Sequence, residues 1–263
     1  MTAPLPLKQR LITGTPVYGT IVSFGTPPFA EMLSKCGFDF LWLDLEHSSM
    51  SLETVHCMLA AMDGSGCEGI VRVPTNDPAW IKRVLDLGPD GVIVPLVNSR
   101  AEAEAAVRAC LYPPAGIRGA AAGRAHDYGF SFTEYVARAN DNLLIIPQVE
   151  HIDAVNVIDE ILRVERIDVI FIGPFDLSGS LGRLGDTTHP EVVAAIDRVV
   201  EACQAAGKPF GILAKNAADA RHWRRRGFCF LPISVDCLLI GDWMNQMIEA
   251  AGLQDGPGDV RHV

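Results

Sequence analysis

The stretch from Phe38 to Val73, FDFLWLDLEHSSMSLETVHCMLAAMDGSGCEGIVRV, contains one complete copy of the pattern that determines the fold. A short apolar run at Phe38–Leu43 is followed by a helical pattern over Ser51–Asp63 and then by a second apolar run at Gly69–Val73. Both runs are nearly continuous in apolar character, which is typical of strands that are covered on both faces of a parallel sheet. The stretch therefore predicts a strand, a helix and a second, parallel strand.

The same alternation continues along the chain. Eight apolar runs occur, at Val17–Ser23, Phe38–Leu43, Gly69–Val73, Gly91–Leu96, Leu143–Val149, Asp168–Ile172, Phe210–Leu213 and Phe228–Ser234. Helical patterns lie between them, at Ser51–Asp63, Ala79–Leu87, Arg100–Leu111, Ala154–Leu162, Glu191–Ala206 and Ala217–Arg226. Eight β/α units predict a closed (β/α)8 TIM barrel that forms a single domain over residues 1–263. A doubly wound open sheet is the alternative, because the interpretation depends on the strand count.

Residues that begin and end helices agree with this alternation. Pro190 is placed to open a helix, and Gly88, Gly207 and Gly227 follow helical patterns where helices should end. The sequence Ser131-Phe-Thr-Glu134 resembles a capping box.

Composition narrows the classes of function. The chain has 263 residues, with 22 Lys and Arg against 32 Asp and Glu, for a net charge of −10. This charge would repel a phosphate backbone, so nucleic-acid binding is not expected. The seven cysteines are odd in number and none has the C-x-x-C spacing, which indicates free thiols in a reducing cytoplasm. No apolar stretch approaches the length of a membrane helix.

Polar side chains gather where the predicted strands end, and the active site of a TIM barrel forms at that rim. Glu150 follows the fifth strand and Asp176 follows the sixth, about one β/α unit later. Neighbouring strands would therefore present both carboxylates at the same rim. Two carboxylates together with waters and a bidentate substrate suit Mg²⁺ or Mn²⁺. The alternative is two acids that cap helices.

Two further strand ends carry groups suited to a small acid substrate. Arg72 lies within an apolar strand and must find an anionic partner, either a bound carboxylate or an internal salt bridge to Asp44 or Glu46. His47 follows the second strand, and its near-neutral pKa suits it to proton transfer. Asp86 is an acid on an otherwise apolar helix and is a candidate for orienting His47, with an exposed position or a helix-end contact as the alternative.

One interval is longer than the alternation requires, because the strands that start at Gly91 and Leu143 lie about twice as far apart as one β/α unit. The excess, residues 112–131, is rich in Pro and Gly, and loops of this length are commonly functional. Its position after a helix places it nominally at the end of the barrel away from the active site.

In their order along the chain, these motifs resemble the class II pyruvate aldolases of the HpcH/HpaI (hydroxy-oxo-heptanedioate aldolase) family. The resemblance spans roughly Gly14 to Ala251. The segments that carry it are Asp44-Leu-Glu-His47, Val71-Arg-Val-Pro-Thr-Asn-Asp-Pro78, Tyr112-Pro-Pro-Ala-Gly-Ile-Arg-Gly119, Gln148-Val-Glu150, Phe171-Ile-Gly-Pro-Phe-Asp-Leu-Ser178 and Gly211-Ile-Leu213.

The resemblance implies a role for each candidate residue. Glu150 and Asp176 would bind a divalent metal, Mg²⁺, Mn²⁺ or Co²⁺. Arg72 and Gln148 would hold the pyruvate unit, and backbone groups near Gly173 and Phe175 would receive its carboxylate. His47, supported by Asp44 and Asp86, would transfer the proton. The family also implies a homo-oligomer, a hexamer built as a trimer of dimers, with the last helix exchanged between subunits.

The expected reaction is reversible cleavage of a 4-hydroxy-2-oxo acid to pyruvate and an aldehyde. Leu45, His151 and Phe175 depart from the better-known members of the family, and His151 and Phe175 would lie near the pocket, where they would affect the aldehyde partner. Two alternatives remain, a lyase acting on a CoA thioester and a catalytically silent barrel that binds a small dicarboxylate.

Overall fold

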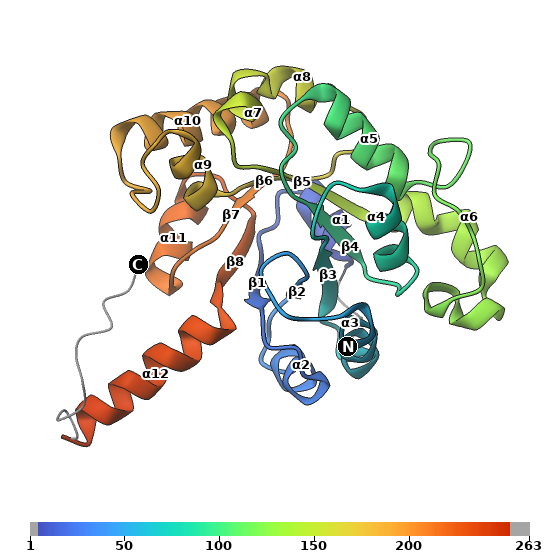
Figure 1. Ribbon diagram of the computed structural model, residues 1–263, viewed down its shortest axis with the longest axis horizontal. Coiled ribbons are helices and arrows are strands. Elements are labelled where there is room, and N and C mark those ends of the chain that lie inside the picture. Colours follow the sequence, from blue (N-terminus) through green and yellow to red (C-terminus); the bar gives the residue numbers. More distant parts are fainter. Residues whose placement is uncertain (1–4, 253–263) are drawn as a thin grey trace.

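The computed structural model describes residues 5–252, and its core is a closed barrel of eight parallel strands in the order β1 to β8 (Figure 1). β1 pairs with β2 on one side and with β8 on the other, which closes the sheet. The predicted (β/α)8 TIM barrel is confirmed, and the open-sheet alternative is wrong. The strands are β1 Val17–Val22, β2 Phe40–Asp44, β3 Glu68–Arg72, β4 Gly91–Val94, β5 Leu144–Val149, β6 Ile170–Ile172, β7 Phe210–Ile212 and β8 Phe230–Val235.

Helices surround this barrel. They are α1 Leu7–Ile12, α2 Pro27–Ser34, α3 Leu52–Met62, α4 Pro78–Leu85, α5 Arg100–Cys110, η1 Arg124–Gly129, α6 Phe132–Asn142, α7 Ile152–Asn156, α8 Ile158–Leu162, α9 Pro174–Ser180, α10 Pro190–Ala205, α11 Ala217–Arg225 and α12 Asp236–Ala250. The single helix expected over 154–162 is two short helices, α7 and α8. Pro190 opens α10 as expected. The capping box at Ser131 is absent, because its hydroxyl donates to Asp127 instead of capping α6.

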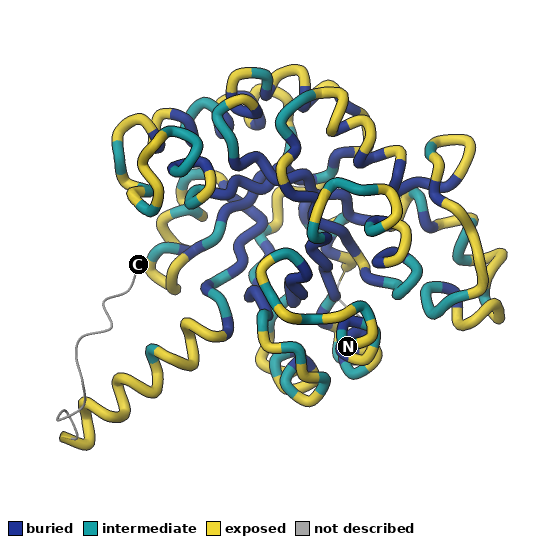
Figure 2. The backbone as a smooth tube through the Cα atoms, viewed as in Figure 1, coloured by how far each residue is buried: buried dark blue, intermediate teal, exposed yellow. Residues whose placement is uncertain are grey.

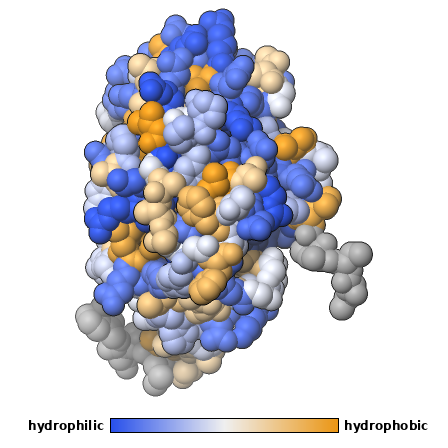
Figure 3. All heavy atoms as spheres, turned by 90° about the vertical axis from the view of Figure 1, so that its right-hand side faces the viewer, coloured by the Kyte–Doolittle hydropathy of each residue, from blue (hydrophilic) through white to orange (hydrophobic). Residues whose placement is uncertain are grey.

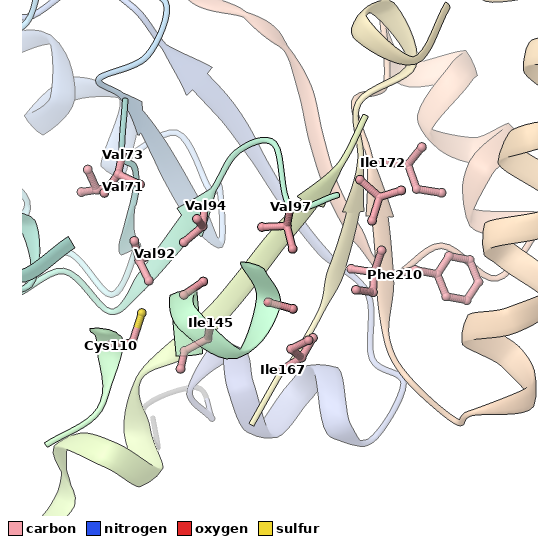
Figure 4. Packing of buried hydrophobic residues seen from close by; sticks show 14 of the residues in the cluster. Val71, Val73, Val92, Val94, Val97, Cys110, Ile145, Ile167, Ile172 and Phe210 are labelled. Atoms are coloured by element: carbon pink, nitrogen blue, oxygen red, sulfur yellow. The ribbon is translucent and has the colours of Figure 1, made fainter. Parts of the chain in front are cut away.

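Alternate residues along each strand point to two different cores, because the side-chain period of a strand is two. One set packs with Leu7 and Leu11 of α1 inside the barrel, and it includes Phe40, Trp42, Ile70, Ile93, Leu144, Ile146 and Phe230. The other set packs against the surrounding helices (Figure 4), and it includes Leu41, Leu43, Val71, Val92, Val94, Ile145 and Phe210. Burial of each large apolar side chain of this kind contributes about 1.5–3 kcal/mol to the stability of the fold. The strands are buried along their length and the outer helix faces are exposed (Figure 2).

The segment 112–131 lies beside the C-terminal end of α4, which is the N-terminal end of the barrel. Buried Arg118 donates to the Leu85 carbonyl at 3.0 Å and contacts the Asp86 carboxylate at 3.3 Å. Its guanidinium lies 4.4 Å from the centre of the Tyr112 ring. The structure therefore places this segment, which the order of the elements alone did not place, at the end of the barrel away from the candidate site. The surface that carries α6 is mixed in polarity, with apolar side chains scattered among hydrophilic ones (Figure 3).

The last described helix, α12, differs from the others because it projects away from the barrel (Figure 1). Its exposed apolar side chains include Leu238, Trp243, Met244 and Met247. Within residues 5–252, no helix has the length and apolar character needed to cross a membrane.

Candidate active site

The period-two alternation of the strands carries the candidate residues into the mouth of the barrel. Asp44 lies two residues after the inward-facing Trp42, and Arg72 lies two residues after the inward-facing Ile70. Gln148 and Glu150 continue the inward set of β5. All four side chains are buried, although all are polar. The sequence thus places an apolar core inside the barrel and a polar cluster at its C-terminal rim.

Arg72 lies at the centre of this cluster. Its Nε donates to Asp44 Oδ1 at 2.9 Å and its Nη2 to Asp44 Oδ2 at 2.6 Å. Its Nη1 lies 2.9 Å from Glu46 Oε2 and 3.4 Å from Gln148 Oε1. The internal salt bridges considered as an alternative are therefore present, but Arg72 also lines the cavity described below. A guanidinium has five N–H donors, so at least one remains for a bound carboxylate.

Glu150 is held in place on two sides. The backbone N–H of Leu96 donates to Oε1 at 2.8 Å, and Gln148 Nε2 donates to Oε2. Gly173 packs directly against this pair, because a Cβ at that position would lie 2.8 Å from Glu150 Oε2 and 2.9 Å from Gln148 Nε2. Only glycine fits there. Leu96 itself has a positive φ of 52°, a conformation that costs a residue with a Cβ about 1 kcal/mol or more.

Four carboxylates lie around Arg72 at this part of the rim, those of Asp44, Glu46, Glu150 and Asp176. Burial raises the pKa of Glu150 to about 7, and the charges of Glu46 and Asp176 act in the same direction. Burial likewise raises the pKa of Glu46 to about 7, with Asp44 and Asp176 adding to the effect. Burial acts to lower the pKa of Arg72, but its hydrogen bond and charge interaction with Asp44 outweigh this, so the pKa is raised. The cluster has excess negative charge that one guanidinium does not balance.

His47 lies at the edge of the cluster. Its side chain is 63 % exposed, and its Nε2 lies 3.6 Å from Glu46 Oε2. Its backbone N–H donates to Asp44 Oδ1 at 3.3 Å. The expected proximity of His47, Asp44 and Arg72 is observed.

Asp86 does not lie with them in this chain. It is the residue that ends α4, and it contacts Arg118 at the opposite end of the barrel. The physical reason is that α4 runs antiparallel to the strands, so its last residue returns to the N-terminal end. Within one chain, Asp86 does not orient His47.

A cavity of about 330 Å³ opens beside these residues. The expected site residues that line it are Asp44, His47, Arg72, Gln148, Gly173, Phe175 and Asp176. The other lining residues are Ile21, Ser23, Trp42, Phe171, Pro174, Leu213, Val235 and Cys237. Polar strand ends do not point to this second set, because most of its members are apolar. The ends of β1, β7 and β8 can be read from the sequence, however, and several of these lining residues lie there.

The family model for "HpcH/HpaI aldolase/citrate lyase" aligns with residues 21–241 of this chain. The chain belongs to the HpcH/HpaI aldolase/citrate lyase family. The matched residues include every strand from the end of β1 to β8, and therefore the entire rim described above.

Curated relatives of this HpcH/HpaI family member are aldolases. A 5-keto-4-deoxy-D-glucarate aldolase of Shigella boydii is 39% identical over 234 residues, which cover 89% of this chain and 91% of the relative. A hydroxypyruvate/pyruvate aldolase of Chromohalobacter salexigens is 40% identical over 237 residues, covering 89% and 92%. An HpcH/HpaI aldolase/citrate lyase family protein of Burkholderia cenocepacia has a similar structure, with a TM-score of 0.90, 35% identity and coverage of 93% and 98%. The expectation of an aldolase is supported over the two alternatives.

The rim of this family member fits a divalent cation. Besides burial, the charge of Asp176 raises the pKa of Glu150, and the cluster's excess negative charge calls for a cation. Among residues 5–252, no group of three or more His, Cys, Asp and Glu side chains forms a complete metal cage. A site with few protein carboxylates suits a hard divalent cation that keeps several waters and shares its remaining positions with substrate.

The three departures from the family pattern have different positions. Phe175 lines the cavity, and Lys215 Nζ lies 5.9 Å from the centre of its ring. Leu45 packs in the outer core between strands and helices. His151 caps α7 by accepting from the Asp153 backbone N–H at 3.2 Å, and it does not line the cavity. Of the three, Phe175 is the one placed to shape the pocket.

Proposed function

We propose that this protein is a divalent-metal-dependent aldolase that cleaves a 4-hydroxy-2-oxo acid into pyruvate and an aldehyde, and that catalyses the reverse addition. The observation that carries the proposal is the meeting of Glu150 and Asp176 with Arg72 and Gln148 at one rim. This arrangement combines a cation site with groups that bind a 2-oxo acid. The aldolase relatives support the same reaction class.

The pyruvate half of the substrate would be held by the chain itself. Arg72 would donate its remaining N–H to the oxo acid, and Gln148 would align both Arg72 and Glu150. Backbone groups at Gly173 and Phe175 would receive the carboxylate. Glu150 and Asp176 would hold Mg²⁺, Mn²⁺ or Co²⁺, which supplies positive charge beside the 2-oxo oxygen as the carbon–carbon bond breaks.

His47 would move the proton in this scheme. Cleavage requires a base that takes the proton of the 4-hydroxyl group, and addition requires the same group to return it. His47 lies on the cavity wall and is exposed enough to act directly or through a water. Glu46, 3.6 Å from His47 Nε2, would stabilise the imidazolium that forms.

Pyruvate release tests this proposal directly. The assay couples lactate dehydrogenase to a panel of racemic 4-hydroxy-2-oxo acids, with Mg²⁺, Mn²⁺, Co²⁺ or a chelator present. We expect release with at least one substrate, loss of release with the chelator and recovery on adding the metal. Absence of release with every metal and substrate would contradict the proposal and favour the CoA-thioester or binding-only alternatives.

We also propose that the protein acts in the cytoplasm as a homo-oligomer, a hexamer made of three dimers, in which each chain is one barrel domain and α12 is exchanged. The seven free cysteines support a reducing compartment. The apolar residues exposed on α12 support packing against another copy, since Trp243 is 58% and Met247 53% exposed. Light scattering of the protein and of a Trp243→Lys, Met247→Lys variant tests this, and we expect the variant to have the smaller mass.

A further inference from the structure

The polar side chains of the cavity form two groups. The first is the cluster around Arg72 that would hold the metal and the pyruvate unit. The second lies on the wall formed by the ends of β7, β8 and β1, where Ser23 lines the cavity together with the apolar Leu213, Val235 and Ile21. Cys237 is the other lining residue of this wall with a polar atom, and sulfur is a weak hydrogen-bonding group. Ser23 is therefore the principal polar contact that this wall offers to a substrate.

The Ser23 hydroxyl already donates its hydrogen within the protein. Its Oγ donates to Oδ1 of buried Asp236 at 2.6 Å, a short bond of the charge-assisted kind. Backbone N–H groups complete the surroundings of this carboxylate, from Ser23 at 2.9 Å, Phe24 at 2.8 Å and Cys237 at 2.8 Å. Four donors satisfy an ionised carboxylate, which only accepts. Ser23 Oγ is left with lone pairs and no hydrogen for the cavity.

An irregularity in β8 brings Asp236 to this position. The register between β1 and β8 shifts between Gly19 and Ile21, and Ser234 at the shift has a positive φ of 58°. Thr20 Oγ1 donates to the Ile233 carbonyl at 2.9 Å and braces the irregular strand. Bulges of this kind re-aim side chains near active sites. Here the result is that Val235 lines the cavity while Asp236 reaches the end of β1.

We propose that Ser23, positioned by Asp236, determines specificity by accepting a hydrogen bond from a hydroxyl group of the aldehyde fragment. The inference rests on the proposed function, because it assigns the wall opposite the pyruvate cluster to the aldehyde. It adds a substrate class, the hydroxylated aldehydes. An aldehyde without a hydroxyl would leave the oxygen of Ser23 without a donor on an otherwise apolar wall.

The test measures kcat/KM for addition of pyruvate to two matched pairs of aldehydes, glycolaldehyde against acetaldehyde and glyceraldehyde against propanal. The quantity of interest is the preference for the hydroxylated member in the natural protein divided by the same preference in Ser23→Ala. Intrinsic differences in aldehyde reactivity and hydration cancel in this ratio. We expect a value of about five to ten, the effect of one neutral hydrogen bond. Ser23→Thr, which keeps the hydroxyl, should restore the preference.

Cys237→Ala is the matched control, because it alters the same wall without removing the oxygen. It should change both members of a pair equally. Exchange of the pyruvate methyl protons in D2O reports the pyruvate half separately and should persist in Ser23→Ala. If Ser23→Ala does not fold, Ser23→Cys keeps the shape and replaces the oxygen with a weak acceptor.

Two outcomes would overturn the assignment. One is an unchanged preference in Ser23→Ala. The other is an equal loss of aldehyde addition and of pyruvate proton exchange, which would show that Ser23 acts only by supporting the structure at the end of β1. Either is distinguishable from failure of the proposed function, in which no variant and no aldehyde would give a product.

Discussion

The two ends of the barrel both carry acids but use them differently. At the N-terminal end they include Asp39, Glu68, Asp90 and Asp168, and at the C-terminal rim they include Asp44, Glu46, Glu150 and Asp176. Each acid of the first group accepts a backbone N–H, from Tyr18, Leu7, Gly69 and Ile145 respectively, at 2.7–2.9 Å.

Basic residues of α1 form ion pairs with two acids of the N-terminal group. Lys8 Nζ lies 3.1 Å from Asp168, and Arg10 Nη1 lies 2.6 Å from Asp39. At the C-terminal rim, Arg72 forms ion pairs with both Asp44 and Glu46, and its charge also interacts with that of Glu150. The first group therefore joins neighbouring strands, whereas the second group retains charge that a metal and a substrate can satisfy. The difference separates structural acids from candidate catalytic ones within one fold.

Glu150→Gln should have the largest effect on activity. Loss of the proposed metal-binding carboxylate would remove several kcal/mol of stabilisation of the developing negative charge, so kcat/KM should fall by about 1,000-fold or more. Glu68→Gln makes the same chemical change at the other end of the barrel and should leave kcat/KM within about two-fold. Pyruvate release under saturating metal measures both. Equal losses in the two variants would contradict the proposed division of roles.

His47→Ala should reduce turnover by about 100-fold, the lower range for loss of a general acid–base group. Pyruvate binding in the presence of metal, measured by calorimetry, should persist because Arg72 and Glu150 remain. His222→Ala, an exposed histidine of α11, is the matched control. Unchanged turnover in His47→Ala would remove this residue from the mechanism.

Asp168→Ala should lower stability rather than activity. The change removes the acceptor of the Ile145 N–H and the partner of Lys8, so the free energy of unfolding should fall by about 1–3 kcal/mol. Urea unfolding measures it. Asp176→Ala at the C-terminal rim should abolish metal-dependent activity and leave the metal-free stability unchanged or higher, because it removes one like charge. A stability loss as large as that of Asp168→Ala would weaken the comparison.

The smallest effect expected is a change in the pH dependence of stability. Burial raises the pKa of Glu68 to about 7 from its ordinary value of 4.5, with the charges of Asp90 and Asp39 adding to the shift. Between these values the folded chain keeps a proton that the unfolded chain releases. The free energy of unfolding therefore falls as pH rises through this window.

Glu68→Gln removes this titrating group. Its unfolding free energy should fall less steeply between pH 4.5 and 7 than that of the natural chain, and it should be relatively more stable at pH 8. Denaturant titrations across this range measure the slope. Parallel slopes for the two proteins would show that Glu68 does not contribute.

The sequence by itself determined the barrel and most of its rim. Near-continuous apolar runs at regular intervals predicted eight covered parallel strands, and strand ends located Asp44, Arg72, Gln148 and Glu150. These features depend on short-range periodicity, because a period of two carries a residue two positions after a core residue to the same side of the strand.

Only the tertiary structure decided which groups meet across the barrel. It placed Asp86 with Arg118 rather than beside His47, and it left the apolar side of α12 exposed. It also joined Ser23 to Asp236, which is far away in sequence, through the irregular pairing of β1 and β8. Such contacts depend on register, helix direction and closure of the sheet, none of which a local pattern of residue types specifies.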